Sequence, residues 1–197
     1  MSYSQFSLSE VQELFNLSIT EGVGLFAGLP STPISDYLQE TLNYNISLAL
    51  AINSEKARSE LIIAPVLVEL KKLTGYGLFS GVEFNVDPSQ GLAGYVDFLV
   101  SRDPEQLFVK APVVTIVEAK KEDINNGLGQ CVATLVAAQI FNERKGLIIP
   151  ELLGTVTTGS AWKFLKLSGK SLSIDLDEYT IKDAPKILGI LTKFCLD

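Results

Sequence analysis

Histidine is absent from this chain of 197 residues. Without imidazole there can be no Ser-His-Asp or Cys-His machinery, no histidine-ligated zinc and no histidine proton shuttle. Any catalysis must therefore rest on carboxylates, lysines, tyrosines or a bound metal. The carboxylates are the first candidates.

Cysteines and long apolar runs are also scarce. Cys131 and Cys195 lie far apart and neither belongs to a CxxC pair, so neither a disulfide framework nor a cysteine-ligated zinc is indicated. We interpret both as reduced, mostly structural thiols. No apolar run approaches the ~20 residues that a membrane-spanning helix needs, and the start of the chain lacks the pattern of a signal peptide. We therefore expect no membrane insertion and a cytoplasmic location.

Basic residues are outnumbered, with 16 Lys and Arg against 23 Asp and Glu and a formal net charge of -7. Domains that coat nucleic acid through bulk charge are usually basic, so this balance argues against that class of protein. It is compatible with an enzyme that approaches phosphate through a metal, because a bound cation reverses the local field of the carboxylates that hold it.

The length suits one domain with a single substantial core. Within residues 1–197 we expect a helical N-terminal extension (1–53), a core (54–167) and a C-terminal strand and helix (168–197). Residue patterns predict helices at 6–16, 33–52, 54–73, 125–142 and 183–194, and strands at 78–86, 92–100, 113–117, 153–158, 162–167 and 172–176. A Gly-rich loop is expected at 21–30, and Ser54 is expected to cap the helix at 54–73. The order of helix, three strands, helix and strand predicts an α/β core with a mixed central sheet flanked by helices.

Charged residues stand at the end of the β-branched strand predicted at 113–117. Side chains alternate along a strand, so Glu118 and Lys120 point to the same side, and such groups are costly in an apolar setting unless paired, hydrated or bound. Asp97 interrupts another apolar strand and could approach Glu118 from there. Two such carboxylates would suit Mg²⁺ or Mn²⁺. The alternative for Asp97 is a buried acid satisfied by backbone amides or by Lys120.

Two helical residues complete the candidate set. On a helical wheel Glu60 falls on the apolar face with Ile63 and Leu67, whereas Glu69 falls on the far side. A charged group on an apolar face usually needs a partner such as a metal or a lysine, although a helix-edge glutamate can also extend into solvent. Gln130 lies on the helix that follows Lys120, where its amide could orient a water, a carboxylate or a phosphate, or serve only as a structural hydrogen bonder.

These residues together resemble the pattern of the PD-(D/E)XK superfamily, the restriction endonuclease-like nucleases. In that family an Asp on one strand and a Glu-x-Lys on the next bracket a divalent metal, an acid often comes from the preceding helix, and a Gln can follow on the next helix. The corresponding residues, in the same order, are Glu60, Asp97, Glu118-Ala119-Lys120 and Gln130. The resemblance covers residues 54–142 and implies a restriction endonuclease-like core.

The sequence departs from the family pattern at two positions. Val96 precedes Asp97 where the family has proline, a relaxation that leaves the carboxylate chemistry in place. Thr134 lies four residues after Gln130 in place of the tyrosine of the exonuclease-type QxxxY pattern, so the RecB-like subgroup is not supported.

The resemblance implies a divalent-metal-dependent phosphodiester hydrolase, that is, a nuclease that acts on nucleic acid. Within this class we expect a DNA endonuclease. Glu60, Asp97 and Glu118 would bind Mg²⁺, with Mn²⁺ as a substitute. Lys120 would position the attacking water or stabilise the developing charge, and Gln130 would support the ligands or touch the backbone phosphate. Because nucleases of this type often cut as dimers, we also expect self-association.

Two other functions remain open at this stage. A nuclease-like scaffold without catalysis, acting as an interaction or regulatory protein, would explain the acidic composition. Metal-dependent hydrolysis of a small phosphate ester would use the same carboxylates. The intact set of Asp97, Glu118 and Lys120 favours catalysis on nucleic acid, whereas the net charge favours the scaffold.

Overall fold

The computed structural model describes residues 2–196 and contains one open sheet of eight strands. The strand order is β1-β7-β6-β5-β4-β3-β2, with the short β8 paired to β6. β4 runs parallel to β5 and β1 parallel to β7, whereas the other neighbours are antiparallel. The strands are β1 (Ser18–Gly22), β2 (Gly77–Glu83), β3 (Tyr95–Ser101), β4 (Val113–Ala119), β5 (Leu152–Thr157), β6 (Ala161–Ser168), β7 (Ser171–Asp175) and β8 (Tyr179–Thr180).

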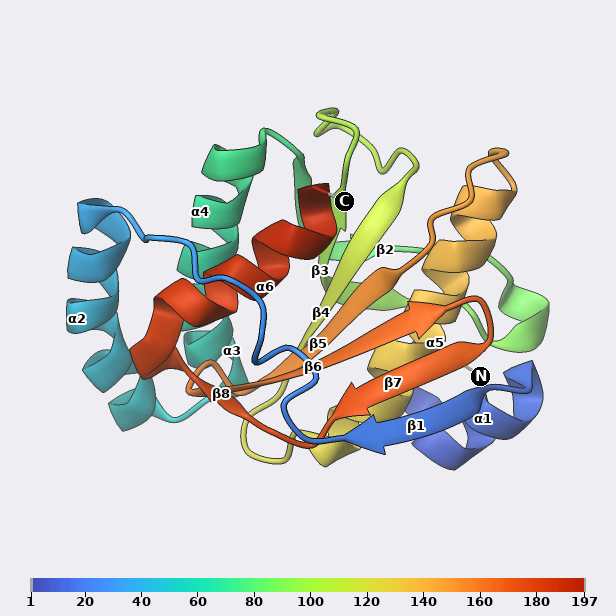
Figure 1. Ribbon diagram of the computed structural model, residues 1–197, viewed down its shortest axis with the longest axis horizontal. Coiled ribbons are helices and arrows are strands. Elements are labelled where there is room, and N and C mark those ends of the chain that lie inside the picture. Colours follow the sequence, from blue (N-terminus) through green and yellow to red (C-terminus); the bar gives the residue numbers. More distant parts are fainter. Residues whose placement is uncertain (1, 197) are drawn as a thin grey trace.

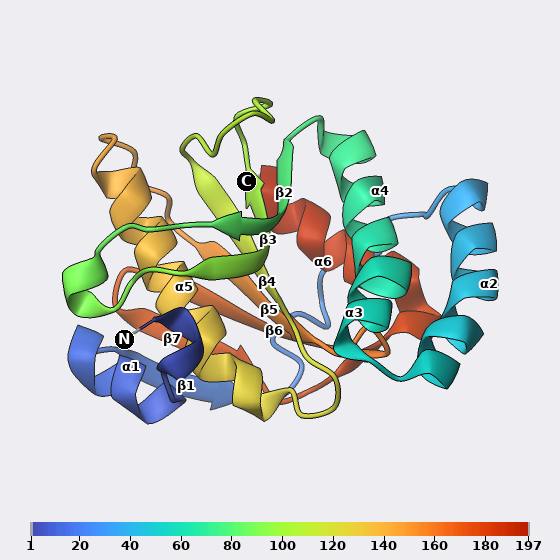
Figure 2. The same cartoon turned by 180° about the vertical axis from the view of Figure 1, so that it is seen from behind.

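Helices cover both faces of this sheet. α1 and α5 lie on one face, and α2, α3, α4 and α6 lie on the other (Figures 1 and 2). The α-helices are α1 (Leu8–Phe15), α2 (Asp36–Ile52), α3 (Glu55–Arg58), α4 (Ala64–Thr74), α5 (Asn125–Glu143) and α6 (Ala184–Leu196). Within residues 2–196, none of the helices is both long and apolar enough to cross a membrane. The predicted α/β class, with a mixed sheet flanked by helices, is confirmed.

The central strand β4 and the helix after it place the charged residues of interest. All seven residues of β4 are buried, as its β-branched sequence predicts. The chain then crosses over through α5 to the parallel strand β5. α5 packs against β4 and β5, and its small residues Ala133 and Ala137 are fully buried in that contact. The carboxyl end of β4 and the first turns of α5 therefore lie together.

The helix expected at residues 54–73 is interrupted, and Pro65 explains the interruption. Ser54 caps α3 by accepting a hydrogen bond from the Ala57 N–H, as predicted. A π-helical turn, η2 (Ser59–Ile63), then precedes α4, which has Pro65 in its first turn. Proline cannot donate to the carbonyl four residues earlier, and the Leu61 carbonyl accepts from the Asn45 side chain at 2.9 Å instead. The extra residue in the π turn changes which side chains face the core.

The N-terminal segment contributes a strand that the residue pattern did not predict. β1 pairs in parallel with β7 at one edge of the sheet, so residues 1–53 are not only helical and the expected loop at 21–30 starts inside a strand. The pattern gave little signal, since four of the five β1 residues are polar or glycine and all are at least partly exposed. Pairing with β7 and the neighbouring loop contacts determine this strand.

A carboxylate and lysine cluster at the end of strand β4

Asp97 and Glu118 are cross-strand neighbours. β3 and β4 are antiparallel with Phe98 opposite Val117, and continuing this register places Asp97 opposite Glu118. Directly opposite residues of an antiparallel pair point to the same face, which here is the α5 face. The Ala119 N–H donates to Asp97 Oδ2 at 2.8 Å, which fixes the orientation of that carboxylate. The expected approach of the two acids is therefore present in the structure.

Glu118 is almost completely buried, with 1% of its surface exposed. One oxygen, Oε1, accepts a hydrogen bond from Lys120 Nζ at 2.7 Å. The other, Oε2, is buried and has no hydrogen-bond partner among the described residues 2–196. Buried polar atoms are normally satisfied, so an unpartnered carboxylate oxygen beside a second acid points to a missing proton or cation.

Burial, together with the neighbouring charge of Asp97, raises the pKa of Glu118 to about 8. The attraction of Lys120 works in the opposite direction but does not overcome burial. Asp97 lies within reach of a hydrogen bond from the protonated Glu118 side chain. At neutral pH the raised pKa favours the protonated form of Glu118.

Lys120 is held in position by the acids around it. Burial favours its neutral form, but the charge and hydrogen bond of Glu118, with added attraction from Glu55 and Asp97, outweigh burial and raise the pKa of Lys120. Its Nζ also donates to Gln130 Oε1 at 3.3 Å. Lys120 is thus a fixed cation, 22% exposed at its side chain, between the buried acid and solvent.

Helix α5 approaches the lysine closely because of a glycine. A Cβ atom on Gly127 would lie 2.5 Å from Val156 Cγ1 and 3.1 Å from Lys120 Cε, so a larger residue would push the helix off the strand. One turn later, Gln130 accepts a hydrogen bond from Lys120, which is the structural hydrogen bonding that was one of its two predicted uses. Gly127 was not among the sequence candidates. A glycine inside a predicted helix often has a packing reason, and this signal could have identified it.

Glu60 occupies a different position from the one its pattern predicted. Its side chain is 63% exposed and forms an ion pair with Lys56 at 3.7 Å, beside a surface hollow that Tyr37 and Lys72 also line. The expectation that it projects from the apolar face is wrong. A wheel of 100° per residue does not describe a segment that contains a π turn and then Pro65.

The same change of helix register affects Glu69. This residue was expected on the polar side but is only 4% exposed, and its Oε1 accepts from the Ser35 N–H at 2.8 Å. The acid that the structure does bring near Lys120 from this part of the chain is Glu55. It was missed because it is exposed in the first turn of α3, where acids are common for reasons of helix stability.

The donor atoms of this cluster suit a divalent cation. Asp97 and Glu118 offer carboxylate oxygens from adjacent strands, and Glu118 Oε2 has no partner among residues 2–196. Mg²⁺ is commonly held by one or two carboxylates together with waters and substrate phosphate, so two acids suffice for that class of site. No group of three or more potential acid or cysteine ligands occurs among residues 2–196. The cluster therefore fits an open, two-carboxylate site.

Comparison with known proteins found no match: no family model, no curated protein and no solved structure matches the chain.

Proposed function

We propose that the chain is a divalent-metal-dependent phosphodiester hydrolase that cleaves nucleic acid, with DNA as the favoured substrate. One observation carries the proposal: Asp97 and Glu118 lie side by side on adjacent strands, and a buried Glu118 oxygen next to Lys120 has no partner in the described part of the chain. The order α4, β2, β3, β4, α5, β5 also agrees with the restriction endonuclease-like core that the sequence resembles.

In this proposal Asp97 and Glu118 hold Mg²⁺ or Mn²⁺. The ion, when bound, would polarise the scissile phosphate and lower the pKa of a bound water. Asp97 keeps its orientation because Ala119 donates to one of its oxygens. Glu118 would lose its proton when such an ion binds and would offer the oxygen that has no partner among residues 2–196.

Lys120 supplies the fixed positive charge of the site. Its Nζ is anchored by Glu118 and Gln130, so it can hold the attacking water or stabilise charge that develops on the phosphate. Gln130 acts through Lys120, to which it is bonded, and is a positioning residue. Glu60 is left out of the proposed ligands because its side chain is paired with Lys56.

Cleavage of supercoiled plasmid and of single-stranded DNA, with and without MgCl₂, tests the proposal. Wild type should cleave only with the metal. Asp97→Asn, Glu118→Gln and Lys120→Met should each reduce the rate by at least about 10²-fold, the loss typical of removing a group that acts on the reacting phosphate. The matched control is Glu40→Gln, which changes an exposed acid on α2 in the same way.

A non-catalytic scaffold is the second candidate, and one observation favours it: the only acids within the cluster are Asp97 and Glu118, with no third ligand among the described residues. Calorimetric titration with Mg²⁺ separates the two. The nuclease is supported if wild type binds Mg²⁺ and cleaves DNA and if Glu118→Gln loses both binding and cleavage. Absence of both binding and cleavage in the folded wild type would leave the scaffold.

A further inference from the structure

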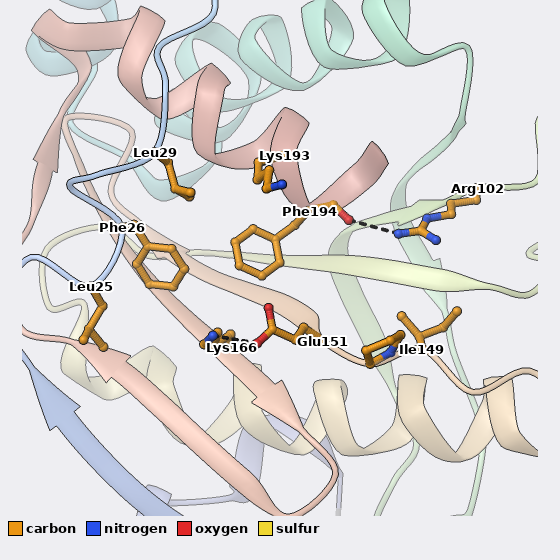
Figure 3. A pocket seen from close by; sticks show the side chains of 10 residues that line it. Leu25, Phe26, Leu29, Arg102, Ile149, Glu151, Lys166, Lys193 and Phe194 are labelled. Carbon is orange, nitrogen blue, oxygen red and sulfur yellow. Dashed lines mark hydrogen bonds and ion pairs between the residues drawn. The ribbon is translucent and has the colours of Figure 1, made fainter. Parts of the chain in front are cut away.

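A cavity of about 310 Å³ lies on the face of the sheet opposite the carboxylate and lysine cluster (Figure 3). It is bounded by α6, by the loop between β1 and α2, and by the start of β5. β4 and β5 are parallel, and Glu118 lies beside Val156 near the end of β5. The cavity is therefore at the other end of β5 from the proposed nuclease site and is independent of it.

One wall of this cavity is apolar and aromatic. Phe26 from the loop and Phe194 from α6 stand with their ring centroids 5.7 Å apart, and Leu29 lies beside them (Figure 3). Leu25, which is 44% exposed, forms the rim. Such a wall removes the apolar body of a ligand from water, at a gain of about 25 cal/mol per Å².

Four other lining residues are charged, and their net sign is opposite to that of the chain. Among the described residues, Arg102, Lys166 and Lys193 line the cavity with one acid, Glu151 (Figure 3), whereas the chain as a whole carries -7. Lys166 Nζ and Glu151 Oε1 form an ion pair at 2.6 Å, with both side chains about a third or more exposed. This pair fixes the lysine at the cavity without removing it from solvent.

Arg102 binds the end of helix α6 from the same cavity. Its Nε donates to the Cys195 carbonyl at 2.9 Å and one terminal nitrogen reaches the Phe194 carbonyl at 3.4 Å. A guanidinium has five N–H donors, so these two bonds do not exhaust it. The arginine also offsets the negative end of the α6 dipole, which would otherwise repel an anion.

We propose that this cavity binds a small organic acid, with its anionic group between Lys166, Lys193 and Arg102 and its apolar body against Phe26 and Phe194. The apolar wall alone would accept a neutral compound of the same shape. The excess of cations over the single acid adds selectivity for the anion, because charge-assisted hydrogen bonds are stronger than neutral ones. A volume of about 310 Å³ is enough for a ligand of one or two rings.

A pair of probes of nearly equal shape tests the anion selectivity. 2-Naphthoate and 2-naphthylmethanol are titrated by calorimetry into the whole chain, with EDTA present so that the metal site plays no part. Naphthoate should bind at one site about tenfold more tightly than the alcohol, the ratio that one charge-assisted hydrogen bond provides. Equal affinities, or no binding of naphthoate, would overturn the proposal.

Three variants locate the binding. Lys166→Gln should weaken naphthoate about fivefold to tenfold, and Glu151→Gln should tighten it several-fold because it removes the opposing charge next to Lys166 and releases this lysine. Lys170→Gln, in the exposed turn after β6, should change nothing. The alcohol should bind equally to all four proteins.

The opposite signs of two of these effects separate a ligand contact from a folding defect. A structural disturbance would weaken both probes in both Lys166→Gln and Glu151→Gln, with a lower melting temperature. If naphthoate affinity is the same in these two variants and in wild type, it binds elsewhere and the proposed cavity is wrong.

Discussion

Two acids at strand ends, Asp175 and Glu118, are both buried, at 0% and 1% exposure, but their surroundings differ. Asp175 Oδ1 accepts from the Gly24 and Asp177 N–H groups, and Oδ2 accepts from the Phe26 N–H and the Tyr179 hydroxyl. One oxygen of Glu118 accepts from Lys120, and the other has no partner among the residues that the structure describes. The two sites are at the ends of β7 and β4 respectively (Figure 1).

The difference separates a structural acid from a candidate ligand. The four donors around Asp175 come from the β1–α2 loop and the segment after β7, so this carboxylate joins the N-terminal segment to the sheet. A carboxylate whose two oxygens each accept two hydrogen bonds has its polar atoms satisfied within the protein. Glu118 has no such support, and its environment favours a proton or a cation on the free oxygen. Burial alone therefore does not distinguish the two roles, but hydrogen-bond satisfaction does.

Exchange of each acid for its amide should give the largest contrast. In Asp175→Asn the new NH₂ group must face two donors whichever way it turns, so we expect a loss of about 2–4 kcal/mol in the free energy of unfolding. Glu118→Gln should instead raise it at pH 7, by up to ~3 kcal/mol, because the amide imitates the protonated acid and needs no proton that the unfolded chain lacks at this pH. Urea unfolding at pH 7 measures both. Equal losses in the two variants would contradict the distinction.

Stability should also depend on pH through Glu118. The folded pKa of about 8 lies above the ordinary value of 4.5, so the folded protein binds this proton more tightly than the unfolded chain does. The resulting stabilisation is complete below about pH 4.5 and is lost as pH rises through about 8. Each pH unit within this window costs at most ~1.4 kcal/mol.

Urea unfolding of the metal-free protein at several pH values between 5 and 8.5 measures this loss. Glu118→Gln removes the titrating group and should show a flatter profile. A wild-type profile that coincides with that of the variant would show that Glu118 does not control the slope.

Mg²⁺ should bind at Glu118 and not at Asp175. Because Glu118 carries a proton at pH 7, metal binding should release close to one proton, and affinity should increase from pH 6 to pH 8. At a concentration about 100-fold above the dissociation constant, the metal should add ~2.7 kcal/mol to the free energy of unfolding. Titration in two buffers with different ionisation enthalpies measures the released proton.

The same titration of Glu118→Gln should show neither binding nor stabilisation, whereas Glu40→Gln should behave as wild type. Binding with an affinity independent of pH would place the metal away from Glu118.

The smallest effect is expected for Gln130→Ala. Its bond to Lys120 is 3.3 Å long and reaches a partly exposed group, so we expect a loss of ~0.5 kcal/mol in stability. If Gln130 positions Lys120, the cleavage rate should fall by more than this stability change accounts for, with KM little altered. Gln130→Glu, which keeps the acceptor oxygen, should recover part of the rate. Steady-state kinetics of both variants against wild type measures this.

The sequence was most informative where local rules act alone. The β-branched run before Glu118 predicted a buried strand, the Ser54 cap predicted the start of α3, and α5 was predicted almost to its ends. The approach of Asp97 to Glu118 was also expected from their positions on neighbouring strands. These features depend on alternation, capping and short connections, which can be read from the residues directly.

Other features depended on parts of the chain that are distant in sequence. Glu60 could not be placed because Pro65 and a π turn changed the helix register. β1 could not be recognised because its polar residues gain a strand partner only from β7. The cavity at Phe194 combines residues from the loop before α2, from β6 and from α6, and no local pattern indicates such a meeting.

The absence of histidine and the spacing of Asp97, Glu118 and Lys120 were determined by the sequence alone. The absence leaves carboxylates, lysines, tyrosines or a bound metal for any catalysis. The tertiary structure decided which acids are satisfied. Asp175 meets four donors and Glu118 Oε2 meets none within the described residues. The physical reason is that hydrogen-bond partners of buried groups come from several segments of the folded chain, whereas residue patterns report only the local segment.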